Sequence, residues 1–587
     1  MSARALWFGP EGRPLFGWLH RPDDGRARGA VVLCPALGLE GVCSRRAYRQ
    51  LAERLEEQGI AALRFDYDGT GDSAGGESDP GRVEAWMASV GAAVELVRGA
   101  GASRVVVVGM RVGATIAAGA VARAGVDGTG VGGTGVGGAG VDGAGVDGMV
   151  LWDPCASGRT YLREQRALGL MSIGVETSDD GSVEVPGIVY QAETVEDLGA
   201  LTIAGTEGPL AERVLVLVRA ERTANKAMVS RLQMDHVEWG VAEGQSEMVD
   251  VEPWQVRQPT AAIGSVLSWV SGVLGSEAGP FSDLRAAAGS VEGTADGGAT
   301  TETIVEIGPV GLFGIVTERA GSAGGATAIL FNAGTMDHVG PSRLWVEFAR
   351  RWARGGVRTL RFDLSGLGDS PVRVGQQMDV AYPPEALDDL SEVVKAMGPD
   401  GAGKIVLSGL CSGGYHSVEG GIALGVRAVC LINPSLIAAP AEAHGDDGEE
   451  RAAEIDPRRQ ATTSRRKWVR ALPGHDFLGS IVDRLPDGAW WLINRVAVGN
   501  PPARIIERLV DAGVETYIVA GESEAREMCR GQAAAFRRLA RTGRFHLEVV
   551  PGIDHELFAR VSRDRVSPMV TERILRSVAT KDPAHRA

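Results

Sequence analysis

One five-residue motif in the second half of the chain could carry nucleophilic chemistry. Gly409-Leu410-Cys411-Ser412-Gly413 directly follows the apolar run Ile405–Leu407. A strand, then Gly-x-nucleophile-x-Gly, then a helix exposes a nucleophile in a tight turn that only small neighbours permit. In this frame Cys411 takes the nucleophile position, and the backbone N–H of Ser412 would face a developing oxyanion. The motif therefore predicts attack by a thiol on a carbonyl carbon.

A thiol nucleophile of this kind needs a base that a carboxylate orients, and candidates for both follow later in the chain. The apolar run Thr516–Ala520 precedes Gly521-Glu522-Ser523-Glu524, and Phe545–Val550 precedes a loop that contains His555. Acid and base therefore follow the nucleophile in the order that this kind of turn normally has. We expect His555 to be the base and Glu524 the acid, with Glu522 as the alternative acid.

The first half of the chain repeats the second. The segment 64–73 (RFDYDGTGDS) returns as 361–370 (RFDLSGLGDS), and Leu151–Pro154 returns as Leu431–Pro434. The elbow motif returns as Gly109-Met110-Arg111-Val112-Gly113, with arginine where the nucleophile belongs. A guanidinium has no lone pair with which to attack a carbonyl. We expect the first half to be a non-catalytic copy.

The other members of the set are also altered in the first half. Glu221 follows the run Val214–Val218 at roughly the acid position, but the segment around 251–254, where a base is expected, contains no histidine. Arg111 is then expected either to form a structural ion pair with Glu221 or Asp153, or to bind an anionic group such as a carboxylate or phosphate.

Short apolar runs alternate with amphipathic segments in both halves, which predicts an α/β fold with a mostly parallel sheet covered on both faces. We expect a degenerate domain over residues 1–274, a Gly-rich linker over 275–300 and a catalytic domain over 301–587. The expected strands and helices are 30–34, 47–58, 61–65, 83–98 and 105–108 in the first half, and 328–331, 344–353, 359–362, 384–397, 405–407 and a last helix over 568–579 in the second.

Three insertions interrupt these domains. Residues 124–148 are five pentads of the AGVDG type, and such Gly-rich repetition predicts a flexible loop. Residues 157–205 and 435–505 are longer than a simple crossover needs, so we expect a cap over each elbow. A basic cluster at 458–467 lies in the second cap, either as a solvated helix face or as a surface for an acidic carrier protein or a phosphopantetheine arm.

Composition narrows the classes of partner. The formal net charge of −15 argues against binding to nucleic acid or to an anionic membrane surface. No signal-peptide core or membrane-spanning run is recognised, and six cysteines without CxxC spacing predict neither a disulfide scaffold nor a zinc site. We expect a cytoplasmic protein without metal or cofactor, whose oligomeric state the sequence leaves open.

The motifs together resemble bacterial α/β-hydrolase superfamily proteins of the exosortase-A-system-associated and serine-aminopeptidase-like kind. The resemblance rests on the segments RFDYDGTGDS, RFDLSGLGDS, NAGTMDHVGPSRLW (332–345), GLCSGG (409–414) and DHEL (554–557). The GxCxG elbow is also similar to the dienelactone-hydrolase branch, whose acid is Asp where this chain offers Glu. The resemblance implies two tandem α/β-hydrolase domains and a second oxyanion donor from Asn332–Thr335, namely the Thr335 N–H.

These expectations converge on acyl transfer through a cysteinyl thioester. We expect a hydrolase of carboxylic esters or thioesters that acts on a small-molecule or carrier-bound acyl substrate. An acyltransferase that passes the acyl group to an amine, thiol or alcohol is the first alternative, and a non-catalytic scaffold that uses Arg111 to hold an anion is the second.

Overall fold

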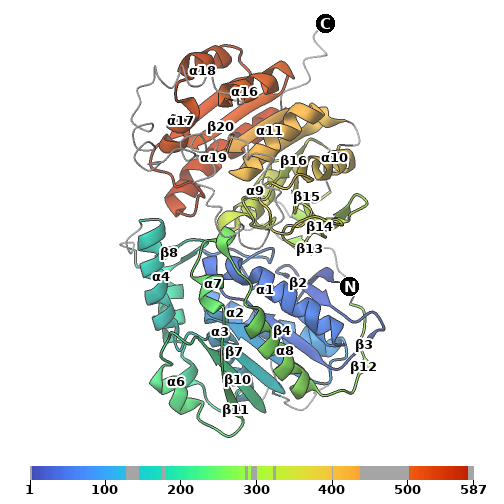
Figure 1. Cartoon of the computed structure of the whole chain (residues 1–587), viewed down its shortest axis with the longest axis vertical. Coiled ribbons are helices and arrows are strands. Elements are labelled where there is room, and N and C mark those ends of the chain that lie inside the picture. Colours follow the sequence, from blue (N-terminus) through green and yellow to red (C-terminus); the bar gives the residue numbers. More distant parts are fainter. Residues whose placement is uncertain are drawn as a thin grey trace, which may run out of the picture. The chain divides into compact units, whose positions relative to one another are not determined.

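The chain folds into two α/β units. The computed structural model describes residues 3–126, 145–174, 180–284, 289–291, 300–321, 325–398, 401–436 and 501–579. The chain divides into residues 1–292 (unit 1) and 293–587 (unit 2). Each unit has a mostly parallel sheet with helices on both faces (Figure 1). The predicted fold class is therefore confirmed.

Unit 1 has the strand order β1-β2-β5-β4-β6-β7-β10-β11. The first two strands run antiparallel to their neighbours, and the strands from β5 to β11 are parallel. Its strands are β1 (Arg4–Phe8), β2 (Leu15–His20), β3 (Arg26–Ala27), β4 (Ala30–Cys34), β5 (Ala61–Phe65), β6 (Val105–Met110), β7 (Gly148–Trp152), β8 (Val183–Val185), β9 (Ile188–Tyr190), β10 (Arg213–Val218), β11 (Val237–Val241) and β12 (Gly279–Pro280). Its helices are α1 (Gly38–Glu57), α2 (Arg82–Gly99), α3 (Val112–Val126), α4 (Gly158–Ser172), α5 (Ala192–Ala200), α6 (Lys226–Arg231), α7 (Gln245–Val249) and α8 (Thr260–Leu274).

Unit 2 repeats this order as β14-β15-β17-β16-β18-β19-β20-β21. Its strands are β14 (Thr300–Ile307), β15 (Leu312–Arg319), β16 (Thr327–Leu330), β17 (Arg358–Phe362), β18 (Ile405–Leu410), β19 (Ala428–Ile432), β20 (Glu515–Gly521) and β21 (Phe545–Val550), and a short strand β13 (Gly289–Val291) precedes them. Its helices are α9 (Leu344–Arg354), α10 (Ala386–Met397), α11 (Ser412–Leu424), α16 (Pro502–Asp511), α17 (Glu522–Cys529), α18 (Ala533–Ala540) and α19 (Arg560–Ala579).

The central strands are apolar because both of their faces are covered. In β6, Val107 contributes to the core on one side of the sheet, whereas Val106 and Val108 contribute to the core on the other. Each of these three valines is fully buried. An uninterrupted valine run is what a strand in the middle of a parallel sheet requires. The carboxyl end of this strand then leads into the elbow at Arg111.

The insertion at 157–205 in unit 1 contains α4, the β8–β9 hairpin and α5. Its two buried tyrosines, Tyr161 and Tyr190, share a hydrogen bond of 2.7 Å between their hydroxyls. The backbone N–H of Leu39 in α1 donates to the carbonyl of Pro186 in the hairpin. The insertion is thus packed onto its own unit. The second predicted cap, 435–505, lies outside the described residues except for 435–436 and 501–505.

The ends of the pentad segment belong to regular structure. Helix α3 continues to Val126, and β7 begins at Gly148. Val146 is buried, and the Asp147 carboxylate accepts the backbone N–H of Val105 at 2.8 Å. The predicted loop over 124–148 is therefore wrong at both ends, because the first pentad completes a helix and the last one leads into a strand. Residues 127–144 lie outside the described residues.

Part of the predicted linker 275–300 also has a defined place in unit 1. Strand β12 pairs antiparallel with β3, and Phe281 is 3% exposed. The boundary between the two units, after residue 292, lies within the predicted segment.

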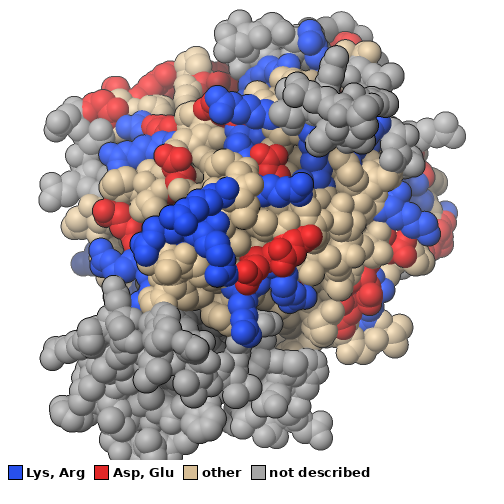
Figure 2. Space-filling model, turned by 90° about the horizontal axis from the view of Figure 1, so that it is seen from above, with Lys and Arg blue, Asp and Glu red and all other residues tan. Residues whose placement is uncertain are grey.

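The surface carries charges of both signs. On the face seen from above in Figure 2, basic and acidic side chains are interspersed, and the basic ones gather near its centre. Arg538 on α18 pairs with Glu507 on α16 at 2.7 Å, which is one example of such mixing. Among the described residues, no helix has both the length and the apolar composition needed to cross a membrane.

Candidate active site

The elbow of unit 2 holds Cys411 in a backbone conformation that is rare for a residue with a side chain. Its φ is 54° and its ψ is −114°, directly between β18 and α11. A Cβ at Gly409 would lie 2.3 Å from the carbonyl carbon of Gly413, and a Cβ at Gly413 would lie 2.7 Å from the carbonyl oxygen of Asn332. Both glycines are therefore required by space. The turn presents a half-buried thiol at the carboxyl edge of the sheet.

The structure brings the predicted base and acid to this thiol. His555, on the loop after β21, interacts with the side chain of Cys411, and this interaction raises the pKa of the imidazole. Its Nδ1 lies 3.4 Å from Oε1 of Glu524, in the first turn of α17. The alternative acid, Glu522, is exposed. Glu524 is thus the carboxylate that contacts the imidazole.

His555 and Glu524 each favour the charged form of the other. Burial alone would lower the pKa of His555, but its hydrogen bonds to Cys411 and Glu524 outweigh burial and raise that pKa well above its usual value. Burial alone would raise the pKa of Glu524, but hydrogen bonds with His555 and Ser523 lower it to about 2. The contact with the Glu524 carboxylate and the interaction with the Cys411 side chain therefore both favour the protonated imidazole.

The sequence analysis missed two residues of this site. Asn433, at the end of β19, donates to the carbonyl of His555 at 2.9 Å, and its side-chain oxygen accepts the N–H of Gly521 at 2.8 Å. It thereby ties the base loop to the strand that carries the acid. Its only available signal was the match of Leu431–Pro434 to Leu151–Pro154, which marks the position as shared by both halves.

The second such residue is Tyr382, on the loop before α10. Burial and the neighbouring Cys411 side chain raise the pKa of the Tyr382 hydroxyl, whereas Ser435 opposes this rise. The Tyr382 ring lies edge-on to Tyr415, with centroids 5.5 Å apart, and next to His416. Nε2 of His416 lies 3.0 Å from the carbonyl oxygen of Ala381. The neighbouring backbone is thus fastened to α11, and the phenol is held against the nucleophile.

The two predicted oxyanion donors lie on neighbouring segments. Ser412 is the first residue of α11, and Thr335 lies on the loop after β16. The backbone N–H of Gly334 donates to Oγ of Ser412 at 2.9 Å, which joins that loop to the elbow. Within the described residues, neither the Ser412 N–H nor the Thr335 N–H has a hydrogen-bond acceptor. Both donors are available to an added oxygen.

The elbow of unit 1 keeps this backbone and carries arginine at its apex. Arg111 has a φ of 54°, identical to that of Cys411. Arg111 as a whole is 2% exposed. It donates to Glu40 at 3.0 Å, to Glu164 at 2.6 Å and to Asp153 at 3.3 Å. Three carboxylates around one cation satisfy its donors and leave no positive charge for an added anion. This geometry favours the structural role over the anion-binding role.

Of the two alternative partners predicted for Arg111, the structure shows Asp153 at 3.3 Å and not Glu221. Glu221 is exposed and accepts a hydrogen bond from Ser246 in α7. These two residues follow the ends of β10 and β11, much as Glu524 and His555 follow β20 and β21. The position in unit 1 that corresponds to His555 is thus near Ser246. It lies earlier in the chain than the segment 251–254, where the sequence analysis expected it. Serine there cannot take up a proton near neutral pH.

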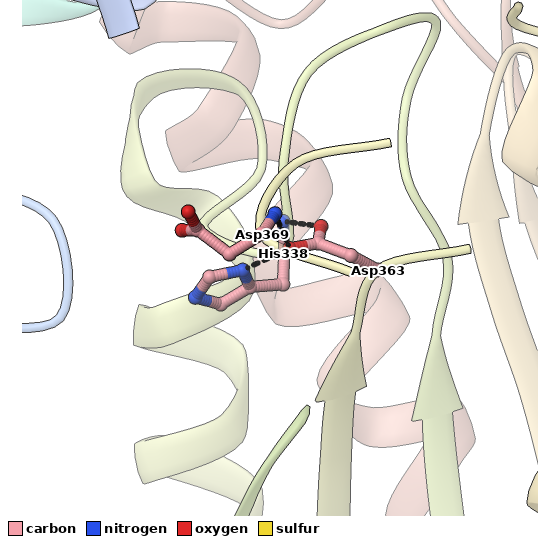
Figure 3. A group of neighbouring side chains, drawn as sticks. All are labelled: His338, Asp363 and Asp369. Atoms are coloured by element: carbon pink, nitrogen blue, oxygen red, sulfur yellow. Dashed lines mark hydrogen bonds and ion pairs between the residues drawn. The ribbon is translucent and has the colours of Figure 1, made fainter. Parts of the chain in front are cut away.

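One group of side chains has metal-ligand chemistry among the described residues. His338, Asp363 and Asp369 offer ligand atoms within 4.8 Å of one another (Figure 3). However, both carboxylate oxygens of Asp363 already accept two N–H groups each, all at 2.7–2.9 Å. A cation would have to displace these donors. The arrangement therefore fits a hydrogen-bonded junction better than a metal centre.

Comparisons with known proteins found a matching family model in each half of the chain. Residues 328–567 match the family model described as alpha/beta hydrolase family. Residues 25–131 match the model described as serine aminopeptidase, S33. A search of curated proteins found no match.

Several solved structures are similar to slightly less than half of this chain. Est1E from Butyrivibrio proteoclasticus is 13% identical, covers 46% of this chain and 98% of its own, and has a TM-score of 0.34. The esterase domain of a Rhodothermus marinus protein is 14% identical, covers 47% and 100%, and has a TM-score of 0.33. A soluble variant of monoglyceride lipase from Saccharomyces cerevisiae is 13% identical, covers 47% and 95%, and has a TM-score of 0.32.

The repeated strand order and the two elbows show two α/β units, of which the second is similar to the alpha/beta hydrolase family and the first to serine aminopeptidase, S33.

Proposed function

We propose that unit 2 is an acyl hydrolase that cleaves a carboxylic ester or thioester through a cysteinyl acyl-enzyme. One observation carries the proposal. Cys411 lies in a positive-φ elbow and interacts with the imidazole of His555, whose Nδ1 in turn contacts Glu524. Nucleophile, base and orienting acid in contact are the signature of covalent acyl catalysis.

The residues divide the reaction as follows. His555 carries the thiol proton of Cys411 when the sulfur attacks the carbonyl carbon, and the electron pair of the C=O bond moves onto the oxygen. The N–H groups of Ser412 and Thr335 bind this oxyanion, and such donors act most strongly where charge develops. Collapse of the intermediate expels the alcohol or thiol, which takes its proton from the His555 imidazolium. Water then attacks the thioester, His555 accepts the proton of that water, and the carboxylic acid and free Cys411 result.

Transfer to another acceptor uses the same acyl-enzyme. An amine, thiol or alcohol in place of water would make unit 2 an acyltransferase. The third possibility was a scaffold that binds an anion at Arg111, and the three carboxylates around that guanidinium argue against it. We therefore place the activity in unit 2, with a small-molecule or carrier-bound acyl group as substrate.

The decisive experiment is mass spectrometry of the intact full chain after incubation with p-nitrophenyl esters and acyl thioesters of increasing chain length. We expect one acyl adduct on the wild type and none on Cys411→Ala. Cys529→Ala is the matched control, because Cys529 is the other thiol that is not fully buried. An adduct that persists in Cys411→Ala would refute the proposal. Turnover with and without an added amine then separates hydrolysis from transfer.

A further inference from the structure

The loop that carries Thr335 is held from three directions. Gly334 donates to the Ser412 side chain, as described above. Asn332 donates to the Met336 carbonyl at 2.9 Å and accepts the N–H of Leu364 at 2.9 Å. At the far end of the loop, His338 meets Asp363. The segment between these points has little freedom to move the Thr335 N–H.

Asp363 is the junction on which both ends of the loop converge. Its Oδ1 accepts the Asn332 amide and the His338 backbone N–H, each at 2.7 Å. Its Oδ2 lies 2.8 Å from Nδ1 of His338 and accepts the N–H of Asp369 at 2.9 Å (Figure 3). Asp363 and His338 have no exposed surface. A buried carboxylate with four donors is rigid, because losing any one donor leaves charge unsatisfied in a low-dielectric site.

Unit 1 serves as an internal control for these contacts. Its Asp66 corresponds to Asp363 and accepts the N–H of Asp72 at 3.0 Å, as Asp363 accepts that of Asp369. The turn after this strand is therefore shared by both units and does not depend on catalysis. The contacts that differ are those made from the oxyanion loop.

The register of the strands identifies the positions that changed. Ala30 pairs with Val105 as Thr327 pairs with Ile405, so Asn332 corresponds to Pro35 and His338 corresponds to Gly41. Neither proline nor glycine has a side chain that can bond to the carboxylate. The copy without a nucleophile thus lacks the two side chains that fasten the loop and keeps the carboxylate itself. This is the pattern expected if the two side chains serve the reaction and Asp363 also serves the fold.

We propose that Asn332 and His338, acting through Asp363, are positioning residues that hold the Thr335 N–H toward the oxyanion formed at Cys411. The inference rests on the proposed cysteinyl mechanism and adds to it the residues that keep the oxyanion site in place. The two side chains do not touch the substrate. They act by fixing where one donor points, and a displacement of about 1 Å at such a donor can slow a reaction by roughly 100-fold.

Two reactions of the same thiol test this role in the full chain. Acylation by p-nitrophenyl acetate creates an oxyanion, whereas alkylation by iodoacetamide displaces iodide and creates none. We expect His338→Ala to slow acylation of Cys411 by about 10- to 100-fold, while alkylation keeps its wild-type rate. His338→Asn should recover most of the acylation rate, because its amide nitrogen can replace Nδ1. Asn332→Ala should show the same selective loss as His338→Ala.

The control is His20→Ala in unit 1, a buried histidine that contacts Arg64 at 3.1 Å and Glu56 at 3.7 Å. It should leave both reactions unchanged. Wild-type acylation in His338→Ala and Asn332→Ala would refute the positioning role, and so would an equal loss of acylation and alkylation in both. If the wild type is alkylated but never acylated, the cysteinyl mechanism itself fails.

Discussion

Replacing Arg111 with methionine should destabilise unit 1 strongly, because Arg111 is a buried cation that contacts three carboxylates. The change removes a cation that is 2% exposed and leaves its carboxylate partners in place. Asp153 keeps Arg219 at 2.5 Å, and Glu164 keeps Arg222 at 3.1 Å. Glu40 loses the only cation that contacts it among the described residues, and its residue exposure is 5%.

The magnitude follows from that one stranded carboxylate. Removing one partner of a buried ion pair typically lowers the free energy of unfolding by about 3–5 kcal/mol. For a unit of this size, the loss corresponds to a fall in Tm on the order of 10 °C. Arg222→Met is the matched control, because Arg222 is 40% exposed and pairs with the partly exposed Glu164. Exposed pairs of this kind contribute about 0–1 kcal/mol.

The pH dependence has a defined sign. Burial raises the pKa of Glu40, and the charge of Arg111 opposes that rise. Without Arg111 the pKa of Glu40 rises further above its unfolded value, so the folded state binds the proton more tightly than the unfolded state does. Stability of the variant then increases as the pH falls. The deficit relative to the wild type should be largest at alkaline pH and should narrow toward acid pH.

Calorimetry and urea unfolding of the full chain measure both effects. Adding Glu40→Gln to Arg111→Met should restore much of the loss, because it removes the stranded charge. Equal stability of Arg111→Met and Arg222→Met, or a deficit that does not change with pH, would show that the buried ion network is not what stabilises this elbow.

Three further outcomes are expected. Glu524→Gln should lower kcat by roughly 100-fold or more while Glu522→Gln leaves it unchanged, as steady-state kinetics would show. The stabilising part of the Glu524 contact should also be lost as pH falls from its unfolded value through about 2, which acid unfolding of wild type and variant would test. Tyr382→Phe should slow Cys411 acylation about 2- to 10-fold, the value of one hydrogen bond, and an unchanged burst rate would contradict this. Deleting residues 129–143 should barely change Tm, because the entropy of closing a connection varies slowly with its length. Deleting residues 129–148 should lower Tm, because a single pentad must then provide both the end of α3 and the start of β7. Equal Tm values for the two deletions would contradict this prediction.

The strands of the parallel core could be predicted well because their cause is local. Ala30–Cys34, Ala61–Phe65 and Phe545–Val550 have the predicted bounds, since continuous apolar runs bounded by turns leave little choice. The antiparallel strands β1, β2, β14 and β15 were not predicted. β14 shows why: polar residues dominate its sequence TTETIVEI, and its pairing with β15 makes it a strand.

The helix starts were less predictable because distant contacts determine them. Helix α1 begins at Gly38, nine residues before the predicted start at residue 47. Its first turn includes Glu40, whose partner Arg111 is 71 residues away. Helix α19 begins at Arg560, and the predicted start, Pro568, lies inside it. Proline fits the first turn of an isolated helix, but the packing of buried Val566 favours the earlier start.

Some residues of the candidate site could likewise be predicted from the sequence, whereas others could be recognised only from the fold. The order of motifs in the sequence predicted Cys411, Glu524 and His555, and the structure brings them together. The partners of Arg111 required the fold, because Glu40 and Glu164 lie on an early helix and in the cap, far from the elbow in sequence. Tyr382 lies on an irregular loop, where no periodic pattern indicates which way a side chain points.

The identical φ of Arg111 and Cys411 has an evolutionary consequence. A positive φ outside glycine costs about 1–3 kcal/mol and persists only where the surroundings enforce it. In unit 1 the enforcing contacts come from the chain itself, since a Cβ at Gly113 would lie 2.1 Å from the carbonyl oxygen of Pro35. Mutation can therefore change the residue at the apex without relaxing the turn that displays it. The backbone thus fixes the point from which the apex side chain projects in both units, and a single substitution at that position changes the chemical group that is presented there.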